Sequence, residues 1–314
     1  MINRDVLRIM VAKGAGEGTL KKISRCIDNS LTYSLDDICN NRNLMCHLGI
    51  NQDVAHNIYE SRDQALMLEE QLYQNNVDMC WIGDDCFPEG LRSLNISDIP
   101  AVLFYTGNYE LLQNKCVGFT GSRKVSDSGI RITDNSARQL SSEGISVVSG
   151  YAKGVDITAH KAALQSGGST IFVIVEGILR NRVKGEVKEL LDDSNHLFLS
   201  QFMPNLTWSA KNAMKRNNTI IGISDAMILI EAGMDGGTFN AGEQSLKNRK
   251  PLFVVEYSVN KPSAEGNTFF LQHGGIPLRG DKTGQPILRG VYSVLEKKEK
   301  HVEYEQMCLD FQML

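Results

Sequence analysis

The chain has 314 residues, room for one large domain and a smaller one. Hydrophobic residues make up 42% and charged residues 22%, which is typical of a globular protein. No apolar run is long enough to span a membrane, and the N-terminus lacks a signal-peptide pattern. The seven cysteines are scattered without a C-x-x-C pair, so we expect reduced thiols, a cytoplasmic protein and no metal site. The net charge of −4 means that any contact with a nucleic acid needs a local concentration of cations.

Residues 1–74 predict a small all-helical domain. Apolar residues recur about every 3.6 positions in "RDVLRIMVAKGAGEGTLKKISRCI", and the "GAGEG" within it predicts a turn between two short helices. The stretch "DVAHNIYESRDQALMLEEQLYQNN" predicts one longer helix with acidic residues on its outer face.

From residue 75 the pattern changes to short apolar runs that alternate with helical stretches. Eight runs, from "DMCWIG" to "PLFVVEY", predict strands, and several of them end in glycine. Helices are predicted over 126–143, 155–166, 184–193, 208–221 and 239–248. This alternation predicts an α/β fold over residues 75–280, an extended Rossmann-like, doubly wound and mostly parallel sheet covered on both faces. Residues 281–314 predict a charged C-terminal tail.

Ligands of such sheets bind beyond the carboxyl ends of the strands, so the loops there carry the functional prediction. In "VGFTGSRKVSDSG", residues 117–129, Gly121 lets the backbone approach a ligand, while Ser122 and Arg123 offer hydrogen-bond donors. The next helix adds the positive end of its dipole. The loop is typical of an anion site, and the alternative is a tight turn with a solvated arginine.

The second loop, "VVSGYAKGVDITAHKAAL", is flexible and cationic at the end of the next strand. It places four candidate residues there: Ser149, Gly150, Lys153 and Gly154. Lys153, close to two glycines, is the better functional candidate. Asp156 predicts an N-cap for the following helix, and His160 is interpreted as a packed helix residue.

Two further segments complete the predicted site. The stretch "NLTWSAKNAMKRNNTIIGISDA" carries Lys211, Lys215, Arg216 and Asn217. Lys211 and Lys215 are i,i+4 neighbours, and like charges so placed are mildly destabilising unless an anion binds there. The fourth segment places Gly236, Gly237 and Thr238 at a strand-to-helix turn that suits an oxyanion. Because all four segments follow strands of one sheet, we expect them to converge.

The anion could belong to a dinucleotide, a free nucleotide or a nucleic-acid strand. A dinucleotide fingerprint needs G-x-G-x-x-G and an acid about 20 residues later. The glycines here are Gly118, Gly121 and Gly129, and no carboxylate occupies the ribose position. This disfavours a nicotinamide enzyme, and we expect no cofactor.

The segments resemble the DNA-processing protein A family, also called DprA or Smf. The resemblance runs over about 80–280 and includes "GFTGSR", "GISVVSGYAKGVDITAHKAALQSGGSTIFVI", "KRNNTIIGISDAMILIEA", "GGTFNAGE" and "EGNTFFLQHGGIPL". The N-terminal helices are similar, more weakly, to the helix-hairpin-helix or SAM-like domain of such proteins.

The resemblance implies a non-enzymatic protein that binds single-stranded DNA, forms a homodimer and loads a RecA-type recombinase during DNA uptake or recombination. It implies phosphate contacts for Ser122, Arg123 and Lys153 in the first two loops. In the later segments it implies the same for Lys215, Arg216 and Asn217, for Gly236, Gly237 and Thr238, and for Asn267 at the family's late "G-x-N" motif, which reads Gly266-Asn267 here. Phosphate contacts of this kind carry no base sequence information.

The chain also departs from the family pattern. The Tyr-Pro segment that usually follows the "STIFVIV" strand is replaced by "EGILRNRVKGEVKEL", where Arg180, Arg182 and Lys184 could supply charge. The family's Arg-Asn-Arg run reads Arg216-Asn217-Asn218, with one cation fewer. We identify no counterpart of the family's C-terminal winged-helix domain, so the chain resembles a divergent member.

Three alternatives stay open. The same fold could serve a nucleotide-binding sensor or a phosphoribohydrolase-like enzyme, for which Glu231 and Glu243 are the candidate carboxylates. It could also serve a DprA-like regulator in an anti-phage defence or toxin-control system. Finally, Gln306–Phe311 fits the Q-x-x-L-x-F pattern of sliding-clamp-binding peptides, and the alternative there is an amphipathic tail that docks on its own domain.

Overall fold

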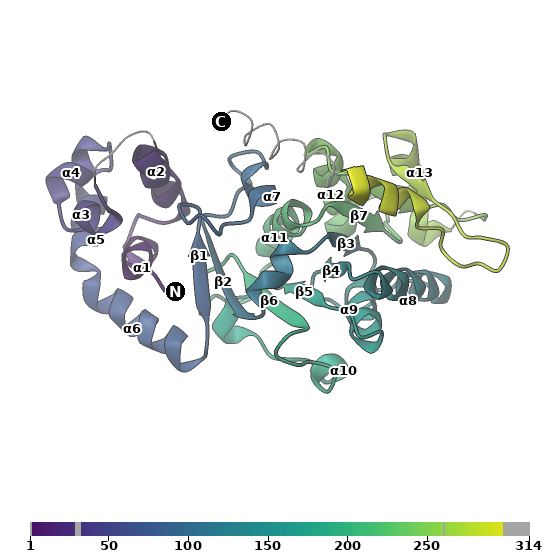
Figure 1. Cartoon of the computed structure of the whole chain (residues 1–314). Helices are drawn as coiled ribbons and strands as arrows, with labels where there is room; N and C mark the ends of the chain where they lie inside the picture. The colour runs from purple at the N-terminus through teal and green to yellow at the C-terminus, as the bar shows by residue number, and fades with distance from the viewer. Residues whose placement is uncertain (1, 29–32, 260, 298–314) are drawn as a thin grey trace, which may run out of the picture.

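A computed structural model describes residues 2–28, 33–259 and 261–297. It divides into a group of helices formed by the first 74 residues and a larger part built on one sheet (Figure 1). Within the described residues, no helix is both long enough and apolar enough to cross a membrane.

The sheet has nine strands in the order β1-β2-β6-β5-β4-β3-β7-β8-β9. Their bounds are β1 Asp78–Trp81, β2 Val102–Gly107, β3 Cys116–Thr120, β4 Ser146–Ser149, β5 Thr170–Val173, β6 His196–Ser200, β7 Ala226–Leu229, β8 Leu252–Val255 and β9 Ile276–Leu278. The strands from β6 to β9 pair in parallel, whereas β1 pairs with β2 and β2 with β6 in antiparallel fashion. The prediction of a mostly parallel sheet is confirmed.

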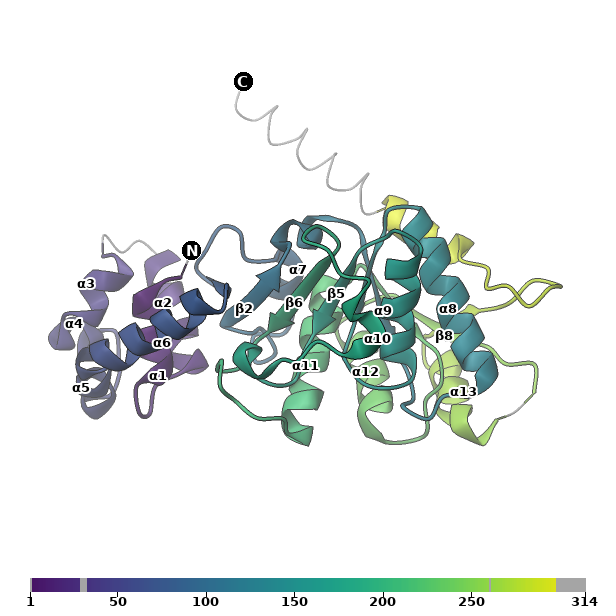
Figure 2. The same cartoon turned by 90° about the horizontal axis from the view of Figure 1, so that it is seen from below.

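Helices cover both faces, as the doubly wound prediction requires (Figure 2). One face carries α8 (Asp127–Ser142), α9 (Val155–Gln165) and α10 (Gly185–Lys188); the other carries α7 (Glu89–Arg92), α11 (Ala210–Ile223), α12 (Gly236–Lys247) and α13 (Glu265–Gln272). Short 3-10 turns lie at Tyr109–Gln113, Ile178–Arg180 and Pro262–Ala264. Strands such as β5 are buried on both faces, which explains why they read as continuous apolar runs.

The N-terminal helices are α1 (Arg4–Val11), α2 (Glu17–Asp28), α3 (Leu35–Cys39), α4 (Arg42–His47), α5 (Gln52–Glu60) and α6 (Arg62–Gln74). The predicted turn between the first two helices is confirmed. The prediction of one long helix over 53–76 was wrong, because the helix breaks at Ser61. The buried Ser61 hydroxyl reaches the Arg8 carbonyl oxygen at 3.0 Å and the Ile58 carbonyl oxygen at 2.7 Å, which holds the junction against α1.

Three features of the sheet part differ from the prediction. The helix expected over 184–193 shortens to α10, and β9 was not predicted as a strand. Residues 289–297 are helical, and Leu288, Val291 and Leu295 are buried in the core. The described start of the expected tail therefore packs on the sheet part, and the domain boundaries stay predictions.

Candidate nucleic-acid interface

The loops after β3 and β4 interlock through two glycines. A side chain at Gly121 would lie 2.4 Å from Val155, and one at Gly154 would lie 2.4 Å from the Ser122 carbonyl oxygen. Gly154 also has a φ of +82°, which L side chains rarely adopt. The Val155 amide donates to the Ser122 carbonyl oxygen at 3.4 Å. The sequence therefore uses glycine where two backbones approach each other.

The cations of these two loops are exposed beside this contact. Arg123, Lys124 and Lys153 have exposed side chains. The Ser122 hydroxyl accepts the Lys124 amide at 3.0 Å, which fixes the turn that carries Arg123. The structure thus brings Ser122, Arg123 and Lys153 to one edge of the sheet with their cationic groups towards solvent.

Arg216 lies beneath this surface. Its side chain is 7% exposed, and one guanidinium nitrogen donates to the Val173 carbonyl oxygen at 2.6 Å. A Cβ at Gly150 would lie 2.0 Å from the same nitrogen and 2.4 Å from an Asp156 oxygen, so glycine is needed there. Burial lowers the pKa of Arg216 and raises that of Asp156, and the attraction between the two charges opposes both shifts. Arg216 forms the floor of the site.

The expectation that Asp156 caps α9 was wrong. Gly154 occupies the N-cap position, and Asp156 lies inside the first turn, where it accepts the Ala152 amide at 3.2 Å. His160 is fully buried, as predicted. Ser149 is also fully buried, and its hydroxyl donates to the Phe119 carbonyl oxygen at 2.8 Å. In this conformation Ser149 supports the loop.

The candidate residues on α11 differ in their exposure and in their bonding partners. Lys211 is exposed, whereas Lys215 forms an ion pair with Glu17 of α2, with its Nζ 2.7 Å from each carboxylate oxygen. Asn217 is buried and donates to the Gly237 carbonyl oxygen at 3.1 Å. That bond ties α11 to the start of α12.

The start of α12 is open. Side chains at Gly236 and Gly237 would meet nothing within 4 Å, and Asp235 at the N-cap makes no side-chain capping bond. The first N–H groups of a helix have no intrahelical acceptor, so Gly236, Gly237 and Thr238 present donors at this edge. An anion would complete this helix start.

Asn267 lies under the edge. It is 3% exposed and donates to the carbonyl oxygens of Ile230 at 2.7 Å and Val255 at 2.9 Å. Its own oxygen accepts the Ala232 amide at 2.9 Å. These three bonds hold the ends of β7 and β8 together, so the structure gives Asn267 a positioning role.

Comparison with known proteins decides the family. A family model described as "DNA recombination-mediator protein A" matches residues 78–282, which is more than half of the chain. The chain belongs to this family. The DprA of Streptococcus pneumoniae is 35% identical over 207 residues, 65% of this chain and 71% of the relative. Protein Smf of Escherichia coli is 28% identical over 58% of this chain, and the match spans only 50% of that relative's length. For the DprA of Bacillus subtilis, 29% identical, the match spans 63% of the relative.

Solved structures agree on the fold of this DprA-family chain. The X-ray structure of Streptococcus pneumoniae DprA aligns with a TM-score of 0.70 and 27% identity, covering 88% of this chain and 95% of that one. The Helicobacter pylori DprA structure aligns with a TM-score of 0.58 and 23% identity over 72% of this chain and 96% of that one. The second likeness shows the fold alone.

The segment that departs from the usual DprA pattern carries a contact that the sequence did not reveal. The backbone amide of Lys184 donates to the Tyr151 hydroxyl at 2.7 Å, and its ammonium lies 4.2 Å from the centre of the Tyr151 ring and bonds the Tyr151 carbonyl oxygen. Burial lowers the pKa of Lys184, and Glu186, Asp156 and Glu176 oppose that shift. Tyr151 in turn packs edge-on to Phe172, with ring centres 5.0 Å apart. Lys184 thus approaches the site from the replaced segment.

The carboxylates of the enzymatic alternative are not paired in this DprA-family chain. Glu231 is fully buried, accepts the Ser126 amide at 3.0 Å and the Ser126 hydroxyl, and lies 3.8 Å from the Lys261 ammonium. It anchors the start of α8. Glu243 is exposed on α12. Glycoside cleavage needs two carboxyl groups aimed at the sugar, and the engagement of Glu231 does not favour it.

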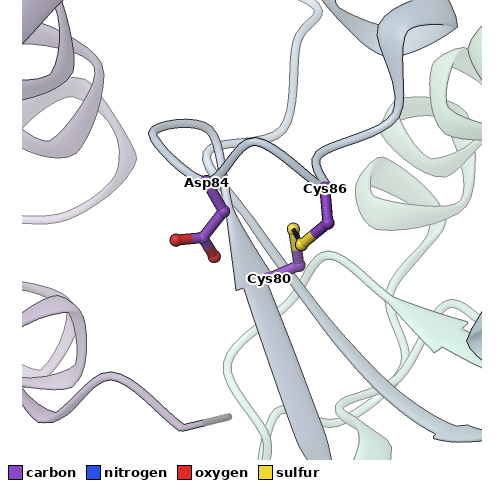
Figure 3. Close-up of side chains that lie close together, drawn as sticks. All are labelled: Cys80, Asp84 and Cys86. Carbon is purple, nitrogen blue, oxygen red and sulfur yellow. Dashed lines mark hydrogen bonds between the residues drawn. The ribbon is translucent and has the colours of Figure 1, made fainter.

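A cluster of possible metal ligands lies elsewhere, in the loop after β1. The ligand atoms of Cys80, Asp84 and Cys86 lie within 4.8 Å of one another, and the two sulfurs are 3.5 Å apart. Figure 3 shows the Asp84 carboxylate turned away from the sulfurs, and one of its oxygens accepts the Trp81 amide at 3.0 Å. A metal here would compete with that bond, so we interpret the group as a pair of thiols.

Proposed function

We propose that this DprA-family protein binds single-stranded DNA at the carboxyl edge of the sheet, protects the strand and helps to load a RecA-type recombinase. The observation that carries the proposal is the exposure of Arg123 and Lys153 on two loops that lock each other in place. Cations held on rigid glycine turns attract phosphate without reading bases. The Helicobacter pylori relative with the same fold was described for its mode of binding single-stranded DNA, which supports the proposal.

The other predicted residues divide into contacts and supports. We propose phosphate contacts for Ser122, Lys153, Lys211 and the amides at the start of α12. The other residues support the site. Arg216 forms its floor, and Asn217 holds the α11–α12 junction. Asn267 and Ser149 hold the strand ends. The homodimer implied by the resemblance remains part of the proposal. The clamp-binding pattern at Gln306–Phe311 lies outside the described residues.

The test is a titration of labelled single-stranded oligonucleotide at several salt concentrations. Binding should weaken as salt rises, with a slope of about 0.7 per neutralised phosphate in log–log form. Arg123→Ala should lower the affinity and reduce that slope, because one cation leaves the phosphate surface.

Arg289→Ala is the matched control. Arg289 is exposed. It lies at the opposite edge of the sheet, because the carbonyl oxygen of nearby Pro286 accepts a hydrogen bond at 3.2 Å from Gln139 in the last turns of α8. The Arg289→Ala variant should therefore bind like the wild type. If the wild type ignores single strands but binds a free nucleotide, the mediator proposal fails and the sensor takes its place.

A further inference from the structure

Trp208 is exposed at a fixed position beside the proposed site. Of the two tryptophans in the chain, Trp81 is 5% exposed and Trp208 is 54% exposed. Ser209 caps α11 by accepting the Asn212 amide at 3.1 Å, and the Leu206 carbonyl oxygen accepts the Gly177 amide at 2.8 Å. The backbone on both sides of Trp208 is therefore held. An indole so placed offers a flat apolar face to solvent.

Cations from two distant parts of the chain meet on α11, the helix that begins two residues after this tryptophan. Lys211 and Lys215 share a helix face with the exposed Met214. On α2, Lys21 and Arg25 occur at i,i+4, and the pKa of Lys21 is lowered by burial, with the Lys215 and Arg25 charges adding to the shift. The contact of 2.7 Å between the Lys215 ammonium and the Glu17 carboxylate joins α2 to α11, so these cations lie in one neighbourhood.

Glu17 and Asp98 act on Lys21 as its counter-charges, and Glu17 also pairs with Lys215. The side chains of this pair are 36% and 22% exposed. Partly exposed ion pairs contribute little net free energy, so a phosphate can replace the Glu17 carboxylate at Lys215 at small cost.

We propose that Trp208, Lys215, Lys21 and Arg25, together with Lys211 of the first site, form an extension of the binding site for the strand, which we name the α2–α11 surface. A base stacks on Trp208, phosphates contact the lysines, and Glu17 is a built-in counterion that the strand displaces. Aromatic faces combined with cations are how proteins hold single strands without sequence preference. The first site and this surface share helix α11, which carries Arg216 beneath Gly150 and Lys215 beside Glu17. The inference rests on the proposed function.

The first measurement is tryptophan emission during titration with an oligothymidylate of about 20 nucleotides. This length exceeds the 4–16 nucleotides that one OB fold, a common single-strand-binding fold, covers. The tryptophan emission of the wild type should be quenched on binding, because a stacked base contacts the exposed indole. Trp208→Ala should lose the quenching and bind at least about five-fold more weakly, since base stacking contributes at least that much when the aromatic residue is replaced by alanine. Phe239→Leu, which alters an aromatic packed against Phe269 and Phe270, is the control that should retain the quenching.

The second measurement concerns the counterion. Glu17→Gln should tighten binding several-fold, and Lys215→Gln should weaken it and lower the salt slope by about 0.7. In the double variant the effect of Glu17→Gln should disappear, because the carboxylate acts through Lys215. A merely structural role of the pair would weaken binding in all three variants.

The outcomes separate the two proposals. Binding that depends on Arg123 but not on Trp208, Glu17 or Lys215 would overturn the α2–α11 surface and leave the proposed function standing. Absence of binding by the wild type would overturn both. Quenching of the wild type and loss of affinity in Trp208→Ala, together with tighter binding by Glu17→Gln, support the surface.

Discussion

His160 shows how one buried side chain couples the candidate site to pH. Its Nε2 donates to the Gly150 carbonyl oxygen at 2.5 Å, its Nδ1 lies 2.6 Å from the Thr170 hydroxyl, and its ring stacks on Phe172 with centres 3.9 Å apart. Burial, with smaller effects of the Lys184 and Arg216 charges, lowers the pKa of His160 to about 3. The ring is therefore neutral in the folded protein and holds the glycine that covers Arg216.

The pH dependence follows from this depressed pKa. Between about pH 6.5 and pH 3 the unfolded chain binds a proton at His160 that the folded chain does not, so stability falls as pH falls through this window. From pH 7 to pH 5 the loss should be about 2 kcal/mol. Urea unfolding of the wild type and His160→Gln at both pH values checks this. Equal losses in the two proteins would contradict it, because every other titrating group is common to both.

The Cys80–Cys86 pair should close under mild oxidation. Cys86 is exposed and Cys80 is buried, with sulfurs 3.5 Å apart, so peroxide reaches Cys86 first. Its sulfenic acid then loses water as the Cys80 sulfur attacks, and overall two thiols and one peroxide give one disulfide and two waters. Mass spectrometry should find the peptide lighter by two hydrogens. Cys86→Ser should abolish this product and Cys46→Ser should not; a stable sulfinic acid at Cys86 in the wild type would contradict the prediction.

At the scale of elements, the contact between the loops after β3 and β4 can be tested by a substitution that adds one methyl group. Gly154→Ala places a Cβ against the Ser122 carbonyl oxygen at a positive φ, so the two loops must separate. We expect a loss of more than about 2 kcal/mol in stability and weaker binding of single strands. Gly144→Ala is the control, since Gly144 has a φ of +72° and nothing within 4 Å. It should cost about 1 kcal/mol and leave binding unchanged, and similar binding by both variants would contradict a role for the interlock.

Local sequence patterns predicted the strands and most helices because buried parallel strands and amphipathic helices leave a period in the chain. The exceptions depend on contacts that no local pattern contains. The break at Ser61 is held by Arg8, which lies 53 positions earlier. β9 has three residues, one of them Pro277, too few for a periodic signal.

The same limit applies to the candidate site. Glycine at strand ends predicted the anion-facing loops, and the structure brings Arg123 and Lys153 to one edge. The partner of Lys215 could not be predicted, because Glu17 lies 198 positions away. The exposure of Trp208 could not be predicted either, since tryptophan is usually packed and no local pattern distinguishes a rim from a core.

At the scale of the whole molecule, the helices of residues 1–74 lie beside the β1 end of the sheet (Figure 1). They contact the sheet part through polar bonds as well as apolar packing. Lys21 donates to the Ile96 carbonyl oxygen at 3.2 Å, and Asn205 donates to Gln71 at 3.2 Å. One cluster of buried side chains includes Leu72 of α6 together with Met79 of β1. Movement of the helices relative to the sheet would therefore change the α2–α11 surface before it changed the Arg123 loop.

The far strand, β9, limits how copies of this chain can associate. The Leu278 carbonyl oxygen accepts the amide of Glu256, the residue directly after β8, so the neighbouring Pro277 turns its backbone away from the sheet. Proline has no N–H to offer a further strand, and β9 has only three residues. A proline and a short strand are two features by which proteins protect an open sheet edge against aggregation. At this edge, a homodimer built on this chain would therefore join through helices or side chains, because edge-to-edge pairing of strands into a fibre is blocked here.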